Sequence, residues 1–156
     1  DVSKSLKSKI ERVTILDQLG NETSQIKCGD GFKIKLTIKV KDVLRNPIVS
    51  ARISNSNNIS IATFRSNDLI VSPFGFDISK SGLEVIIDVK NLLLLNDIYM
   101  ISLSMLDGKE ILDMLPNVVS FEILTGKLND RYNIMTKEKS TNSILFHETN
   151  WEVNYW

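Results

Sequence analysis

Few side chains in this 156-residue sequence have the type and spacing that catalysis requires. His147 is the only histidine, which excludes a multi-histidine metal site and leaves a histidine-based triad with a single candidate. We expect His147 to be an exposed polar residue. Cys28 is the only cysteine, and no neighbouring residue marks it as an activated thiolate. We expect it to be a small, buried or half-buried side chain.

Nucleotide and metal binding also lack their sequence signatures. No glycine cluster has the spacing that aims backbone amides at a phosphate, and the acidic residues are too scattered for a calcium loop. Asp30 and Asp107 stand beside glycines, where an aspartate commonly caps a turn. The sequence therefore predicts a domain that is not an enzyme and that uses no metal and no cofactor.

The charge balance bears on the class of partner. Nineteen basic residues match nineteen acidic ones and the pI is about 6.8, whereas nucleic-acid binders usually carry a basic excess. We expect no nucleic-acid partner. The longest apolar runs, such as Leu92–Leu95, are far shorter than the roughly 20 residues that cross a bilayer. The chain begins at Asp1 without an apolar leader, so we expect residues 1–10 to be a linker remnant from an upstream domain and residues 11–156 to form the binding domain.

The elements that must position any binding residues are strands. Apolar and polar side chains alternate along Phe32–Val40, and turn-forming residues separate further runs of this kind every eight to twelve residues or so. The expected strands are Arg12–Leu19, Phe32–Val40, Val49–Ser54, Ile59–Arg65, Leu83–Val89, Ile98–Leu106 and Val118–Leu124. This pattern predicts an all-β fold, an immunoglobulin-like antiparallel β-sandwich.

The C-terminal segment departs from this pattern. Residues 127–142 are rich in Lys, Asn, Thr and Ser, so we expect a long exposed loop there. Apolar residues return in Ile144–Phe146 and Trp151–Trp156, which we expect to form one or two closing strands. Such a segment must pack on the sandwich or pair with another chain.

The outward faces of three expected strands carry small hydroxyl residues, and the third, sixth and seventh strands of a sandwich usually share one sheet. Small side chains on this face would leave a shallow groove and form its bottom. Hydroxyls and arginines in a groove with an aromatic rim suit a polysaccharide, which presents hydroxyls to planar polar groups and ring faces to aromatics. The candidate carbohydrate-binding residues are Ser50, Arg52, Arg65, Ser102, Ser104, Glu122 and Trp151, with Tyr132 and Tyr155 as further rim candidates.

Other interpretations stay open at this point. Outward serines are ordinary on any sheet with one wet face, and the tryptophans of the tail could pack in a core or a dimer interface. A register error of one residue would replace every groove residue by its neighbour. The serine-lined face carries few charges, which favours a largely uncharged polymer as ligand.

Several short motifs carry a family resemblance over roughly residues 10–155. The chain resembles the C-terminal carbohydrate-binding domain of O-antigen ABC exporters, the Wzt C-terminal type. The family often has glycine before the Tyr99 equivalent and after the third strand, where this chain has Asp97-Ile98 and Asn57-Asn58. The matching segments are Cys28-Gly29-Asp30-Gly31-Phe32, Arg45-Asn46-Pro47 with the strand through Ile53, Leu94-Leu95-Asn96-Asp97-Ile98-Tyr99, and Val119-Ser120-Phe121-Glu122-Ile123 leading to Trp151.

The resemblance implies a non-catalytic module that binds O-polysaccharide in the cytoplasm, at the inner face of the bacterial inner membrane. It also implies an upstream ATPase domain, through which the module would act on a transmembrane subunit of the exporter. Members of the family commonly form homodimers with exchanged or paired terminal strands, and some recognise a modified end of their glycan. Two alternatives are an immunoglobulin-like protein-interaction or adhesin module and a carbohydrate module of a secreted hydrolase.

Overall fold

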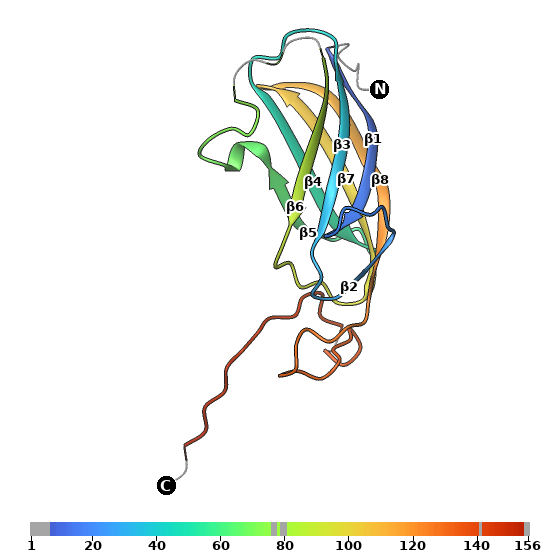
Figure 1. Ribbon diagram of the computed structural model, residues 1–156, viewed down its shortest axis with the longest axis vertical. Coiled ribbons are helices and arrows are strands. Elements are labelled where there is room, and N and C mark those ends of the chain that lie inside the picture. The colour runs from blue at the N-terminus through green and yellow to red at the C-terminus, as the bar shows by residue number, and fades with distance from the viewer. Residues whose placement is uncertain (1–6, 76–77, 79–80, 141, 155–156) are drawn as a thin grey trace.

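The structure, a computed structural model, describes residues 7–75, 78, 81–140 and 142–154. These residues contain eight strands and one turn of 3-10 helix (Figure 1). The strands are β1 (Ser8–Asp17), β2 (Gln25–Lys27), β3 (Phe32–Val40), β4 (Pro47–Asn55), β5 (Ser60–Arg65), β6 (Ser81–Val89), β7 (Asp97–Asp107) and β8 (Glu110–Leu124), and the 3-10 turn is η1 (Ser66–Asp68).

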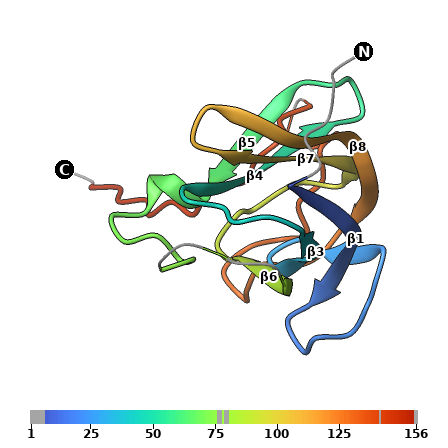
Figure 2. The ribbon, with the colours of Figure 1, turned by 90° about the horizontal axis from the view of Figure 1, so that it is seen from above.

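The strands form two sheets that face each other (Figure 2). One sheet has three strands in the order β1-β3-β6, and the other has five in the order β2-β8-β7-β4-β5. All pairings are antiparallel except that of the short β2 with β8. The predicted all-β sandwich is confirmed, and so is the expectation that the third, sixth and seventh predicted strands share a sheet, since they correspond to β4, β7 and β8.

The largest differences between the observed and the predicted strands are at three places. β1 begins at Ser8, upstream of the expected domain start at residue 11, and Ile10 lies in the core. β2 was not predicted, because three residues are too few to show an alternation. β8 begins at Glu110 instead of Val118, because Asp113 and Pro116 interrupt the pattern that a strand normally shows.

Alternation along the strands fills the space between the sheets. In β3 the five apolar residues are buried, whereas Lys33 and Lys35 are half-buried and Lys39 is exposed. An aromatic cluster continues this core across the sandwich: the ring of Phe32 lies 4.9 Å from that of Phe121, which stacks on Tyr99 at 5.8 Å between centroids. Each sheet therefore contributes rings to one contact at the centre of the molecule.

The hydroxyl of Tyr99 ties the beginning of β7 to the loop before it. Its Oη donates a hydrogen bond to the backbone oxygen of Leu95, four residues upstream, and both residues are buried. Burial also raises the pKa of Tyr99 far above its ordinary value. A tyrosine that bonds back to the backbone in this way is typical of immunoglobulin-like sandwiches, where it holds the corner between two strands.

Asp113 makes a second link between the sheets. Its side chain is only 3% exposed, and Oδ2 accepts a hydrogen bond of 2.9 Å from the backbone nitrogen of Ile10. Asp113 lies on β8 in the five-stranded sheet and Ile10 lies on β1 in the other, next to a register shift between Ile10 and Arg12. The carboxylate thus supplies an acceptor where the sheet ladder is irregular.

Within the described residues, the segment after Leu124 forms no strand of either sheet. Leu145 pairs with Leu94 in a single bridge, flanked by hydrogen bonds of 2.8 Å from Leu95 to Ile144 and 2.9 Å from Phe146 to Leu93. The expected strand at Ile144–Phe146 is therefore reduced to this short pairing. Residues 151–154 are exposed and are not in a strand, and the chain leaves the end of the sandwich after Phe146 (Figure 1). The prediction of a strand there is wrong for these residues, because no sheet edge lies beside them; residues 155 and 156 lie outside the described residues.

Replacing Tyr99 by phenylalanine should lower the free energy of unfolding by about 1–3 kcal/mol, because the buried carbonyl oxygen of Leu95 would lose the hydrogen bond from the tyrosine hydroxyl. Urea denaturation of both proteins would measure the change. Tyr132→Phe is the matched control, since it removes the same atom from a half-buried side chain whose hydroxyl bonds to the backbone of Thr149. Equal losses in the two variants would contradict a special role for the Tyr99 corner.

Candidate functional site

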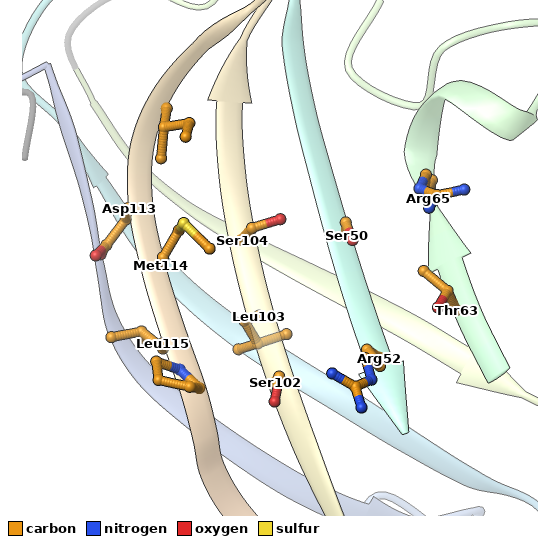
Figure 3. A pocket seen from close by; sticks show the side chains of 12 residues that line it. Ser50, Arg52, Thr63, Arg65, Ser102, Leu103, Ser104, Asp113, Met114 and Leu115 are labelled. Carbon is orange, nitrogen blue, oxygen red and sulfur yellow. The ribbon is translucent and has the colours of Figure 1, made fainter. Parts of the chain in front are cut away.

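The outer face of the five-stranded sheet contains a hollow of about 620 Å³ above β5, β4, β7 and β8 (Figure 3). This volume lies within the roughly 300–1,000 Å³ that is usual for small-ligand sites. Five of the seven predicted site residues line it, namely Ser50, Arg52, Arg65, Ser102 and Ser104. The other lining residues are Thr63, Leu103, Ile111, Asp113, Met114, Leu115 and Pro116.

Strand register brings the polar lining residues into two rows. In the first row Ser50 of β4 is paired with Arg65 of β5 and with Ser104 of β7. In the second row Arg52 is paired with Thr63 and with Ser102. Residues at alternate positions of a strand share a face, so both rows point away from the core. The outward orientation of these residues agrees with the predicted alternation, and their role in binding stays a prediction.

The two arginines have few partners within the chain. Nη2 of Arg52 donates a hydrogen bond of 3.3 Å to the backbone oxygen of Asn58, and Nε of Arg52 is buried without a hydrogen-bond partner. Within the described ranges, no acidic side chain lies within 4.0 Å of either Arg52 or Arg65. Asp113 contributes to the wall of the hollow, but Figure 3 shows its side chain on the side of β8 that faces β1. The hollow therefore carries uncompensated positive charge.

An irregularity in β8 forms the apolar wall of the hollow. Between two paired positions β7 has one residue, Ser102, where β8 has three, including Pro116 and Asn117. Asn117 adopts a φ of 48°, and its backbone nitrogen donates a hydrogen bond of 2.9 Å to Oγ of Ser102. Ser102 Oγ also donates to Oδ1 of Asn117 at 3.3 Å. Ser102 thus stabilises a β-bulge, and its hydroxyl is already engaged.

Glu122 shares the outer face with these residues but does not line the hollow. It pairs with Ile98, four residues along β7 from Ser102, which is roughly 13 Å at the usual rise of a strand. Its Oε1 accepts a hydrogen bond of 3.1 Å from Nε2 of Gln25. Glu122 therefore lies near the β2 end of the sheet, beyond reach of a ligand confined to the hollow.

The aromatic residues of the C-terminal segment do not form a rim. Trp151 is 88% exposed and its Nε1 donates to Oγ1 of Thr149 at 3.0 Å. Tyr132 packs edge-on against Phe146, and its hydroxyl exchanges hydrogen bonds of 3.0 and 2.9 Å with the backbone of Thr149. Tyr132 therefore holds the segment to the preceding loop. Tyr155 lies outside the described residues.

Sequence reasoning missed Thr63 and the whole apolar wall. Thr63 is separated from Arg65 by one residue on the same strand, so the alternation that selected Arg65 could have included it. The wall residues Ile111, Met114 and Leu115 precede the point where β8 was expected to begin. The pair Pro116-Asn117 beside an alternating run was the available signal, because proline inside a strand is typical of a bulge or an edge.

Cys28 and His147, the two candidates for catalytic chemistry, do not line the hollow. Cys28 is buried, as expected, and burial raises the pKa of its thiol, which disfavours the reactive thiolate. His147 is exposed, also as expected. No group of three or more His, Cys, Asp or Glu side chains is arranged to hold a metal ion within the described part of the chain. No helix in that part is long and apolar enough to cross a membrane.

Comparison with known proteins identifies the fold. A family model described as the Wzt C-terminal domain matches residues 1–136. The crystal structure of the C-terminal domain of wzt is similar with a TM-score of 0.78 at 8% identity, over 97% of this chain and 86% of that chain. At this identity the likeness shows the fold alone. No curated protein matches the sequence at a significant level.

Two further structures are more distant. A β-D-mannosidase from Dictyoglomus thermophilum gives a TM-score of 0.44 at 19% identity, over 75% of this chain and 13% of that chain. A β-glucuronidase from glycoside hydrolase family 2 gives 0.41 at 10% identity, over 78% of this chain and 11% of that chain. Neither likeness is strong enough to carry an argument about this chain.

Replacing Ser102 by alanine should lower the free energy of unfolding by about 0.5–1.5 kcal/mol, because the bulge would lose its hydrogen bonds to Asn117. Ser104→Ala is the matched control on the same strand and face. Ser104 makes no side-chain hydrogen bond to the described part of the chain, so we expect a change within about 0.5 kcal/mol. Chemical denaturation would compare the two, and a larger loss at Ser104 would refute the assignment of Ser102 to the bulge.

Proposed function

The chain belongs to the Wzt C-terminal domain family, and from this premise we propose that it binds O-antigen polysaccharide in the hollow on the outer face of the five-stranded sheet. Family membership makes it a non-catalytic module and implies the O-antigen-binding part of an ABC exporter. The choice of face is supported by one observation above the others. Arg52 lies among hydroxyl side chains of three neighbouring strands, opposite an apolar wall on β8.

This arrangement matches the surface of a sugar. The hydroxyls of a sugar ring can bond to Ser50, Ser104 and Thr63, which make no side-chain hydrogen bond to the described part of the chain. The C–H faces of the ring can lie against Met114 and Leu115. A guanidinium supplies several donors in a fixed plane and so can orient a hydroxyl-rich ligand. Glu122 and Trp151 stay candidates for contacts with sugar units that extend beyond the hollow.

In the exporter, the module would act through the rest of its polypeptide. We propose that an ATPase domain precedes residue 1, that the protein works at the cytoplasmic face of the inner membrane, and that glycan binding is coupled to the transmembrane subunit through the ATPase domain. β1 begins at one end of the sandwich, where Lys7 forms an ion pair of 2.9 Å with Glu110. A preceding domain would thus be joined near the turn between β7 and β8.

We also propose that the chain forms a homodimer through its C-terminal segment. Residues 147–154 are exposed, and they include Trp151 and Val153, two large apolar side chains that pack on neither sheet. Arg131 and Tyr132 hold residues 149 and 150 to the preceding loop, which leaves the chain beyond them extended from the end of the sandwich. Pairing with a second copy would bury apolar surface that one copy leaves in water.

A protein-interaction module is the second candidate, favoured by one observation. Leu69, Ile70 and Val71 follow η1 and are all largely exposed, so three consecutive apolar side chains lie on the surface. This candidate predicts that the chain binds no glycan. The binding experiment below therefore separates the two functions.

Arg52→Ala should weaken binding of the O-polysaccharide of the source bacterium by about tenfold or more, because a hydrogen bond from a charged group contributes about 1.5–3 kcal/mol. Isothermal titration calorimetry with lipid-free polysaccharide would measure the dissociation constants. Lys39→Ala removes the same charge from the outer face of the other sheet and should leave binding unchanged. No binding by the unaltered chain would refute the proposed function, and equal effects of the two variants would refute the proposed face.

Light scattering should give the mass of a dimer for the whole chain at tens of micromolar. Removing residues 147–156 should give a monomer, because the proposed interface would be lost while the core of the sandwich stays intact. Circular dichroism would verify that the shortened chain is folded. A monomeric full chain, or a shortened chain that is still dimeric, would contradict the proposed interface.

A further inference from the structure

We infer that the sugar bound in the hollow carries an anionic group, a carboxylate or a phosphate, held by Arg52 and Arg65; this rests on the proposed function. The two arginines lie on adjacent strands and on the same face. Arg65 is paired with Ser50 and Arg52 with Thr63, so the arginines occupy diagonal positions of the ladder. Diagonal neighbours are roughly 7–8 Å apart. Figure 3 shows the Arg52 side chain turned toward Ser102, and rotation about its side-chain bonds would bring it to the same anion as Arg65.

The rest of the hollow offers these guanidinium groups no counter-charge. The one acidic residue in its lining, Asp113, is buried and bonds to Ile10 on the core side of β8. Asp68 lines a neighbouring hollow together with Arg65, but it forms no ion pair with that arginine. Two positive charges thus meet a wall of hydroxyl and apolar side chains.

Some cations on the outer face of the three-stranded sheet form ion pairs. Lys35 lies 3.3 Å from Glu84, and Arg12 lies 3.7 Å from Glu22. These cations have acidic neighbours of their own, whereas Arg52 and Arg65 have none among the described residues. Other cations of the sandwich, such as Lys39, also have no ion pair within the described ranges, so what distinguishes the hollow is that two unpaired guanidinium groups line one concave site.

The chemistry of the donors points to the same group. A guanidinium can donate two parallel hydrogen bonds to the oxygens of a carboxylate or a phosphate, and such charge-assisted pairs are about twice as strong as neutral ones. Nε of Arg52 is buried and has no acceptor in the chain, and an anion at the same guanidinium would offset the cost of burying part of its charge. Ser50, in the row between Arg65 and Ser104, can add a hydroxyl donor to the same group.

This inference changes the expectation drawn from composition. The face is sparsely charged, as the sequence indicated, but apart from the buried Asp113 both charged residues that line its hollow are arginines, and neither forms an ion pair with the described part of the chain. An uncharged polymer would leave the charges of Arg52 and Arg65 without a counter-charge. An acidic sugar unit, or a sugar with a phosphate substituent, would neutralise them within the ligand site.

Chemical treatment of the ligand tests the inference directly. Calorimetry would compare three forms of lipid-free O-polysaccharide from the source bacterium: the intact form, a form whose carboxylates have been reduced to alcohols, and a form from which phosphate has been removed with hydrofluoric acid. We expect one treatment to weaken binding by about tenfold or more. Loss on carboxylate reduction identifies an acidic sugar, and loss on removal of phosphate identifies a phosphate substituent.

Substitutions test whether the anionic group is bound by the arginines of the hollow. Arg65→Gln should weaken binding of the intact polysaccharide but add little to the loss already caused by the effective treatment, because the arginine and the anion would act as a pair. Lys33→Gln, on the other sheet, should have no effect on any form. The inference is overturned if both treated forms bind as tightly as the intact one, an outcome that leaves the proposed glycan-binding function standing. If the intact form does not bind, both proposals fall.

Discussion

The burial of one face of β4 is the constraint on which the hollow depends. Val49, Ala51 and Ile53 are each at most 3% exposed, so the residues between them must point away from the core. A shift of one residue would carry Arg52 into the interior, where an unpaired charge costs more than a marginally stable domain can offset. Because β5 and β7 pair with β4 on its two sides, the same constraint orients the polar side chains of both neighbours.

Sequence reasoning succeeded where this constraint acts and failed where it is relaxed. Ser50, Arg52 and Ser104 follow from alternation alone, because a buried face leaves each strand only one orientation. The start of β8 could not be predicted in this way, since a buried aspartate and a proline both contradict the usual strand pattern. Asp113 is explained only by its partner on β1, which lies about a hundred residues away in sequence and on the other sheet. Contacts of that range are set by packing and have no local signature.

The prediction for the C-terminal segment was wrong for a different reason. Its aromatic residues were expected to form strands, and the apolar content alone supports that expectation. A strand also needs a free edge beside it, and the short pairing of Leu145 with Leu94 takes place outside both sheets. The fold itself is shared with a structure that is only 8% identical, so few particular residues are needed to specify it.

The position of Asp113 has a mechanical consequence. Its backbone belongs to β8, which forms the wall of the hollow. Its buried carboxylate accepts a hydrogen bond from the backbone of Ile10 on β1, three residues after Lys7. A shift of β8 at Asp113 would therefore stretch that hydrogen bond unless β1 moved with it. A ligand that displaced the wall at this residue would thus also act on the first strand of the other sheet.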